Sequence, residues 1–230
     1  MSLIDAAVDL LFDGTCPGCQ LPGKGLCSQC LTMIMAQTVF KPYRSGIDVP
    51  LWSGGYYIEP LTSVIAQAKE HQRWDVIEVL SRRLGLAVAG LADELGLLGH
   101  GFLVPFPSQT TAIQARGYDI TWALAKGAAQ MLSRVGLYAH PTRRLHHIRL
   151  IEDQAGLTSQ ERFINLEGCL KATGRPGVGW LVLIDDVATT GSSLREGVRA
   201  LHCGGYNVDG LATVAATKLH SKGGLGAQFA

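Results

Sequence analysis

The chain has 230 residues, of which 47% are hydrophobic and 17% charged, and its formal net charge is +1. This length suits one α/β domain with a small addition, and the composition is that of a globular protein rather than a disordered one. A net charge this close to zero excludes a general electrostatic attraction to nucleic acid or to a membrane surface.

The sequence predicts neither a secretory signal nor a membrane-spanning segment. Residues 1–12 contain two acids and lack the basic cluster with which a signal peptide begins. The apolar stretch 84–98 is interrupted by Asp93 and Glu94 and is too short to cross a bilayer. We therefore expect a cytoplasmic protein without membrane insertion.

Residues 1–50 predict a short helix, a small metal-binding module and a linker. The helix is expected at 3–11, where apolar residues share one face. Two C-x2-C pairs follow, and four thiolates at this spacing can complete the tetrahedral shell of a structural zinc ion. The four predicted ligands are Cys16, Cys19, Cys27 and Cys30. A redox-active dithiol is the alternative, but nothing nearby resembles a thioredoxin-like unit. Residues 37–50 contain two prolines and a glycine and are typical of a linker.

Residues 51–220 predict an α/β domain whose first part, 51–98, forms a helical hood. A strand is expected at 51–58 and two helices between residues 60 and 98, where Gly85, Gly90 and Gly96 should loosen the far end. Residues 102–104 are a candidate buried strand that runs into a rigid, proline-containing loop at 105–108. The next helix is expected to reach from residue 119 to about 135, with Asp119 as its N-cap.

Residues 142–157 form the most basic stretch of the chain, with three arginines and two histidines between positions 143 and 149. Their polarity favours a mobile hairpin or loop over a core strand. A flexible cationic loop suits a leaving anion, whereas a solvated basic surface is an equally good interpretation. A helix is expected from residue 158 or 159, a strand at 167–170, and a glycine-rich, frayed tail at 221–230.

The most informative stretch is 181–193, in which four apolar residues lead into two acids, a Thr/Gly/Ser loop and a helical pattern. The apolar run is typical of a buried strand in a parallel sheet, and ligands of open α/β sheets bind where such strands end. The loop and the following helix can direct backbone N–H groups at a phosphate. Asp185 and Asp186 suit hydroxyl groups, which donate hydrogen bonds to carboxylates. A P-loop NTPase strand also ends in acids, but the chain has no G-x-x-x-x-G-K-[ST] loop.

This motif resembles the site for 5-phosphoribosyl 1-pyrophosphate (PRPP) in type I phosphoribosyltransferases. The order of the cysteine pairs, the two-proline loop and the acidic strand is similar to that of the ComF/GntX family, whose founding member was named for bacterial DNA uptake. The resemblance implies a Rossmann-like fold with a mainly parallel sheet and helices on both faces. It also includes Lys69 at the end of the first helix of residues 51–98.

The resemblance assigns roles to residues by position. It implies that Asp185 and Asp186 are catalytic and hold the ribose hydroxyls. The implied PRPP-binding set is Asp185, Asp186, Val187, Ala188, Thr189, Thr190, Gly191, Ser192 and Ser193. The implied pyrophosphate loop comprises Pro105, Phe106, Pro107 and Ser108 with Arg116, and the implied flexible loop carries Arg149 and Gln154. Arg116 could instead pair with an acid. The resemblance further implies Mg²⁺ bound with PRPP, in addition to the zinc ion.

The chain departs from the family pattern at several positions. The residues after Arg116-Gly117 are Tyr-Asp-Ile where the family usually has Phe-Asn-Gln, and Ile151 and Gln72 replace a usual Thr and Gly. All of these positions lie outside the PRPP motif. The resemblance therefore predicts phosphate and ribose binding without identifying the acceptor.

Two functions follow from the resemblance. In the first, the protein transfers a phosphoribosyl group from PRPP to a nucleobase-like acceptor and releases pyrophosphate. In the second, it senses PRPP or a nucleotide without catalysis and acts in competence through partner proteins or single-stranded DNA.

Overall fold

A five-stranded sheet forms the centre of the computed structural model, which describes residues 14–70, 73–149 and 159–218. All neighbouring strands of this sheet are parallel, and their order is β1-β7-β6-β2-β3. The strands are β1 (Leu51–Ser53), β2 (His100–Pro105), β3 (Tyr138–Pro141), β6 (Trp180–Ala188) and β7 (Gly210–Ala216). This architecture confirms the predicted Rossmann-like α/β fold.

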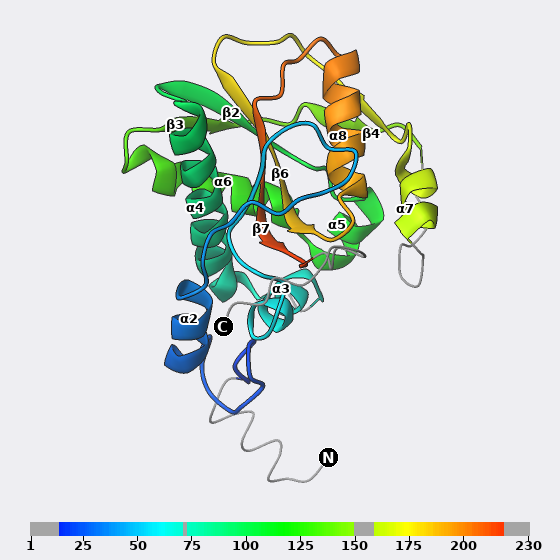
Figure 1. The fold of residues 1–230 in the computed structure, drawn as a ribbon. Coiled ribbons are helices and arrows are strands. Elements are labelled where there is room, and N and C mark those ends of the chain that lie inside the picture. Colours follow the sequence, from blue (N-terminus) through cyan, green and yellow to red (C-terminus); the bar gives the residue numbers. More distant parts are fainter. Residues whose placement is uncertain (1–13, 71–72, 150–158, 219–230) are drawn as a thin grey trace, which may run out of the picture.

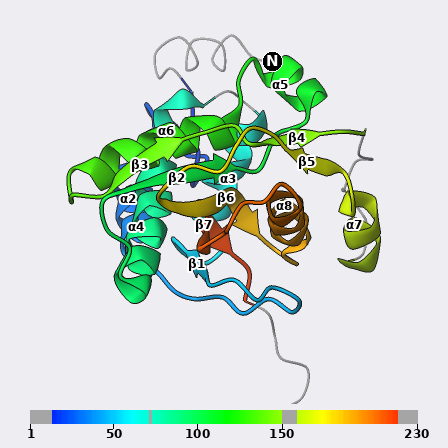
Figure 2. The ribbon, with the colours of Figure 1, turned by 90° about the horizontal axis from the view of Figure 1, so that it is seen from above.

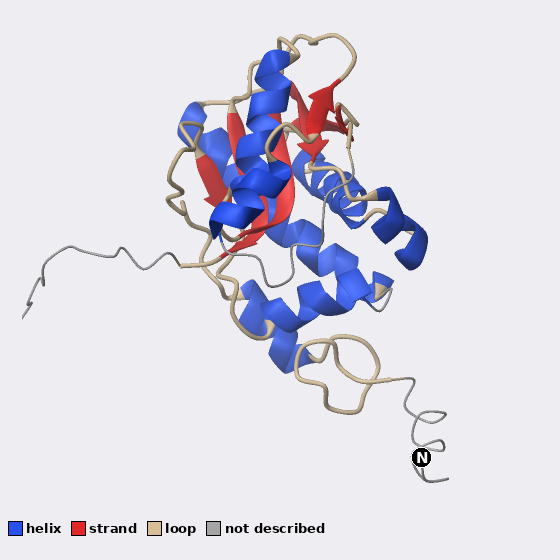
Figure 3. Cartoon of the chain, turned by 90° about the vertical axis from the view of Figure 1, so that its right-hand side faces the viewer, coloured by secondary structure: helices blue, strands red, loops and turns tan. Residues whose placement is uncertain are grey.

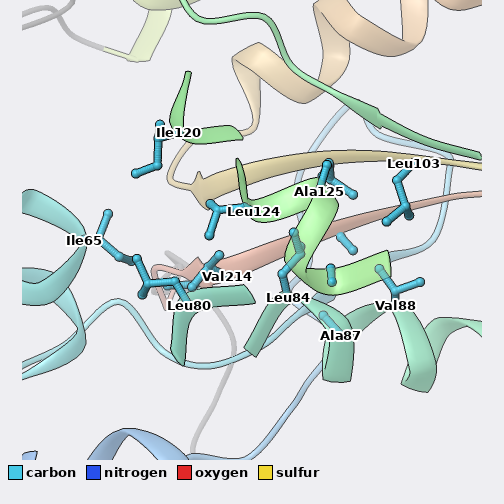
Figure 4. Packing of buried hydrophobic residues seen from close by; sticks show 14 of the residues in the cluster. Ile65, Leu80, Leu84, Ala87, Val88, Leu103, Ile120, Leu124, Ala125 and Val214 are labelled. Carbon is cyan, nitrogen blue, oxygen red and sulfur yellow. The ribbon is translucent and has the colours of Figure 1, made fainter. Parts of the chain in front are cut away.

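Helices cover both faces of the sheet, as expected (Figures 1 and 2). On one face lie α4 (Ile77–Leu95) and α6 (Ile120–Ser133), which pack against each other and against the strands. Figure 4 shows their side chains meeting those of the sheet, with Leu84 and Ala125 between Leu124 and Val88. On the opposite face lies α8 (Ser192–Cys203), which packs on β6 and on a separate two-stranded sheet.

The connections leave the sheet in opposite directions from its two central strands. The chain runs from β2 through α6 to β3 on one side, and from β6 through α8 to β7 on the other. Because β2 and β6 are neighbours, the loops that follow them diverge and leave a crevice at their carboxyl ends. Topology therefore places any ligand site between residues 105–108 and residues 185–193.

The remaining elements surround this core. They are α2 (Ser28–Met35), α3 (Leu61–Glu70), η1 (Trp74–Val76), α5 (Thr110–Arg116) and α7 (Ser159–Leu166), with β4 (Leu145–His147) and β5 (Leu170–Ala172) paired antiparallel. The sequence did not predict α5, and it placed β5 too early and extended β1 too far. The helix expected at 3–11 and the tail at 221–230 lie outside the described residues.

Two glycines of α4 have a role opposite to the one expected. The helix continues without a break through Gly85 and Gly90. A Cβ atom at Gly85 would lie 2.7 Å from the sulfur of Met131 on α6, and one at Gly90 would lie 2.8 Å from the ring of Trp52 on β1. The glycines therefore allow close packing of the helix rather than loosening it. The prediction is correct for Gly96, whose φ of 63° ends α4.

The cysteine module lies against the amino-terminal ends of α3 and α4, below the sheet in Figures 1 and 3. Arg73 donates a hydrogen bond to the Thr15 carbonyl oxygen at 2.9 Å. Arg83, on α4, is 1% exposed and donates to the carbonyl oxygens of Met35 and Gln37 at 3.2 and 2.6 Å. These contacts attach the module to the α/β core through backbone groups.

Candidate functional site

A cavity of about 730 Å³ opens at the carboxyl ends of β2 and β6. Its wall includes nine of the residues that the sequence placed in the site: Phe106, Pro107, Ser108, Arg116, Asp185, Asp186, Val187, Thr189 and Ser193. The structure thus brings together two segments that are separated by about 80 residues in the chain. The crevice expected from the strand connections is the place where they meet.

The acid pair lies within β6 rather than beyond its end. Asp185 pairs with Thr213 of β7, and the strand continues to Ala188. Since side chains alternate along a strand, Asp186 shares the face of Ile184, on the α6 side, and Asp185 shares the face of Leu183, on the α8 side. Both carboxylates are less than one tenth exposed.

Burial disfavours the charge on Asp185. It raises the pKa of this carboxyl to about 8, and the adjacent negative charge of Asp186 acts in the same direction. The Oδ1 atom of Asp185 accepts a hydrogen bond from the backbone N–H of Asp186 at 2.8 Å. The cavity therefore contains a carboxyl group whose charged form is disfavoured by its surroundings.

Lys69 compensates this negative charge from α3. Its Nζ atom lies 2.5 Å from Oδ2 of Asp186. Burial alone would lower the pKa of Lys69, but the charges of Asp186 and Asp185 outweigh it and raise the pKa. The preceding residue, Ala68, accepts a hydrogen bond from the Tyr118 hydroxyl, which fixes the end of α3. The motif resemblance included Lys69, but the sequence did not reveal this ion pair.

The loop after the acids has the geometry expected of an anion site. Gly191, at the N-cap of α8, has a φ of 80°, which favours glycine. The hydroxyls of Thr190 and Ser192 lie 2.9 Å apart, and Arg195 donates to the Ser192 hydroxyl at 3.3 Å. The first N–H groups of α8 lack partners within the helix, and the positive end of its dipole points to the loop. We call residues 188–193 the phosphate loop, after the ligand group that we propose for it below.

The opposite wall of the cavity is the loop of residues 105–108, which several hydrogen bonds fix in place. The hydroxyl of Thr121 donates to the Phe106 carbonyl oxygen at 2.9 Å, and His147 Nε2 donates to the Pro107 carbonyl oxygen at 2.9 Å. Ser108 donates to the carboxylate of Asp119 at 3.1 Å. Asp119 is also the N-cap of α6, as predicted. His147 lines the cavity, although the sequence had suggested no role for a histidine.

The basic residues of the predicted loops occupy different positions. Arg116 lines the cavity, donates to the Ala112 carbonyl oxygen at 3.1 Å and has no ion pair among the described residues. Arg149 does not line the cavity and donates to the carbonyl oxygens of Asn165 and Glu167 at the end of α7. Gln154 lies outside the described residues.

The four cysteines of the module converge as predicted. Their sulfur atoms all lie within 4.8 Å of one another, and the Cys19 and Cys27 sulfurs are 3.9 Å apart. A tetrahedral Zn–S₄ centre with bonds of about 2.3 Å requires sulfur separations of about 3.8 Å. Burial raises the pKa of Cys16, but backbone N–H donors, including those of Cys27 and Gly18, lower it overall to about 6. The cluster can hold a metal ion and is consistent with structural zinc.

Fold and site together define an α/β protein with a Rossmann-like sheet, an acid pair within a central strand facing a cavity, and an N-terminal cysteine module that can hold a metal ion. A comparison with protein-family models finds no match. The chain is 28% identical over 195 residues to Competence protein F of Haemophilus influenzae. The matched region covers 80% of this chain and 82% of that protein. This similarity confirms the resemblance to the ComF/GntX family. None of the helices in the described ranges combines the length and the apolar character needed to span a membrane.

Proposed function

We propose that the cavity binds PRPP and that the protein transfers its phosphoribosyl group to a nucleobase-like acceptor, in support of competence. One observation carries this proposal: the acid pair of β6, with Thr189 and Ser193 of the phosphate loop that follows it, shares one cavity with Ser108 and Arg116 of the opposite wall. That spacing suits a ligand with a diol beside a phosphate and a second anionic group opposite. The competence role comes from the similarity to Competence protein F.

In this proposal each part of PRPP has its own binding group. The ribose hydroxyls donate hydrogen bonds to Asp185 and Asp186, and the 5′-phosphate accepts them from the phosphate loop. Pyrophosphate lies along residues 105–108, near Arg116. A hydroxyl bound at Oδ1 of Asp186 leaves the contact between Oδ2 and the ammonium group of Lys69 in place, whereas a hydroxyl bound at Oδ2 competes with that group. In either case Lys69 supplies a cation beside the ligand.

Transfer requires a new bond to the anomeric carbon. The acceptor nitrogen supplies an electron pair, the carbon–oxygen bond to pyrophosphate breaks, and its electrons leave with the pyrophosphate oxygen. The carboxylates of the acid pair stabilise the positive charge that develops on the sugar. The cavity wall carries carboxylate and hydroxyl oxygens, which are compatible with Mg²⁺, and this ion would neutralise pyrophosphate charge when bound with the substrate. Tyr57 and Ile120 supply apolar wall for a flat acceptor.

A second candidate is a PRPP- or nucleotide-sensing protein without turnover, acting through partner proteins or single-stranded DNA. The Lys69–Asp186 ion pair favours it, because a ligand that breaks this pair acts directly on α3, against which the cysteine module lies. In both candidates residues 1–50 serve as an attachment module and residues 51–220 hold the ligand. The free thiols and the cysteine cluster suit the reducing cytoplasm, where we place the protein.

Calorimetric titration of PRPP with Mg²⁺ tests the proposal. The wild type should bind saturably, whereas a folded Asp185→Asn/Asp186→Asn variant should not. A screen of nucleobases for pyrophosphate release then separates the candidates: acceptor-dependent release identifies the transferase, and binding without release identifies the sensor. Absence of PRPP binding by the folded, metal-loaded wild type would refute the transferase and the PRPP sensor, and absence of nucleotide binding in the same assay would refute the nucleotide sensor.

Single-stranded DNA is tested separately. Binding through phosphate contacts should weaken steeply as the salt concentration rises from about 50 to 200 mM. DNA binding that is insensitive to salt in this range would contradict a backbone-contact mode.

A further inference from the structure

Residues 40–47, expected to be a linker, pack closely on the α/β core. The backbone of Phe40 exchanges two hydrogen bonds with Ser53 of β1, at 3.1 and 2.8 Å, and the Phe40 ring stacks on Tyr56 at 4.1 Å. A turn follows in which the Ile47 N–H donates to the Arg44 carbonyl oxygen at 3.3 Å. The segment connects the cysteine module to β1 and passes the phosphate loop, against which its buried residue Arg44 packs.

Arg44 is a cation in an environment without a counter-charge. Arg44 is 2% exposed, and burial lowers the pKa of its guanidinium group. The guanidinium donates to three carbonyl oxygens, those of Ala188 at 2.6 Å, Thr217 at 2.8 Å and Tyr43 at 2.7 Å. Its buried Nε has no acceptor, and no carboxylate pairs with it among the described residues. A buried charge is costly unless an opposite charge approaches it.

The phosphate loop lies between Arg44 and the cavity. Ala188, which accepts the shortest of these hydrogen bonds, is the residue immediately before Thr189 of the cavity wall. A Cβ atom at Gly191 would lie 3.3 Å from both Cβ and Cγ of Arg44 and 2.9 Å from Ile47. Arg44 itself is not part of the wall. It supports the loop from behind, at the turn where a phosphate would bind.

We propose that Arg44 is a positioning residue of the phosphate loop, which fixes the backbone at residues 188–191 and whose charge is balanced by the phosphate of the bound ligand. The inference deepens the proposed function and rests on it. It assigns to the N-terminal segment a direct part in ligand affinity, beyond joining two regions of the chain.

Arg83 provides a matched control. It is equally buried, its guanidinium also donates to three carbonyl oxygens, those of Met35, Gln37 and Gly54, and it has no acidic partner among the described residues. It lies at the cysteine module rather than at the phosphate loop. Replacing either arginine by methionine removes a buried guanidinium group that is bound to carbonyl oxygens. A difference in ligand affinity between the two variants therefore depends on where the arginine lies.

The experiment measures binding of ribose 5-phosphate and of pyrophosphate to the full-length, metal-loaded protein by calorimetry. Arg44→Met should weaken ribose 5-phosphate binding about tenfold, which corresponds to roughly 1.4 kcal/mol, and leave pyrophosphate binding within about twofold. Arg44→Lys, which keeps the charge but loses the planar fork, should lie between wild type and Arg44→Met. Arg83→Met should leave both affinities unchanged.

Four results would overturn the inference. Unchanged ribose 5-phosphate binding in Arg44→Lys and Arg44→Met would show that the loop does not depend on Arg44. Equal weakening of both ligands, or the same weakening in Arg83→Met, would show a general loss of stability. Wild type that binds neither probe would refute the proposed function itself, and the inference with it. Should Arg44→Met fail to fold, Arg44→Lys decides alone by its ratio of the two affinities.

Discussion

The contact between Lys69 and Asp186 offers the sharpest test of the site as described. We consider Lys69→Met, Asp186→Asn and the double variant. Two unit charges 2.5 Å apart attract by about 7 kcal/mol at an effective dielectric constant of 20 and by about 2 kcal/mol in water. Because the Lys69 side chain is 39% exposed, solvent screening favours the lower figure, and we expect a coupling free energy of about 2 kcal/mol.

Urea denaturation of the four proteins measures this coupling as a double-mutant cycle. Lys69→Met alone should destabilise the protein most, since it leaves two adjacent buried carboxyl groups without a cation, and Asp186→Asn should recover part of the loss. The pKa of Lys69 is raised, so its contribution is present at neutral pH and is lost only as the pH rises through that pKa. Effects that add within about 0.5 kcal/mol would refute the ion pair. Lys41 and Glu94, also 2.5 Å apart but more exposed, form a control pair that should couple less.

Three further predictions concern single positions. Burial raises the pKa of Asp185 from 3.8 to about 8. The ligand-free wild type should therefore lose stability as the pH rises between these values, by at most about 1.4 kcal/mol per pH unit. Urea denaturation at several pH values should show that this pH dependence is absent in Asp185→Asn. Cys19→Ser should lose one zinc ion per chain by metal analysis and melt about 4–8 °C lower for each 2 kcal/mol lost, whereas Cys203→Ser should match wild type in both. Gly191→Ala and Gly205→Ala both place alanine at a φ of 80°, and each should lower the free energy of unfolding by about 1 kcal/mol in a denaturation experiment. Only the Cβ atom at position 191 meets neighbouring atoms, so only Gly191→Ala should weaken ribose 5-phosphate binding, about tenfold in calorimetry. Equal binding by both variants would contradict the loop assignment.

The sequence predicted those features whose cause is local. The strand, the acids and the loop of residues 181–193 are contiguous, so one pattern contains both the buried strand and the polar groups at its end. The four cysteines were recognisable for the same reason, because their spacing alone allows one tetrahedral shell. Asp119 as N-cap also follows from its immediate neighbours.

Features that depend on distant contacts were missed or misread. Nothing around Lys69 indicates that α3 ends beside Asp186, and nothing around Arg44 indicates that it lies behind Gly191. Gly85 was misread because its helix-weakening tendency is local, whereas its close contact with Met131 arises from the packing of two helices. In each case tertiary contact, which a single sequence does not display, determines the role of the residue.

The order of strands also has a consequence for how the chain is made. The edge strand β1 pairs with β7, and Leu51 finds its partner Leu211 only about 160 residues later. During synthesis, the edges of β1 and β6 that pair with β7 therefore stay unpaired until β7 has left the ribosome, although the cysteine module has long been complete. Unpaired edges of this kind promote aggregation. A chain that ends before residue 210 would keep its four cysteines yet expose two sheet edges, so truncation before β7 should lower abundance in the cell.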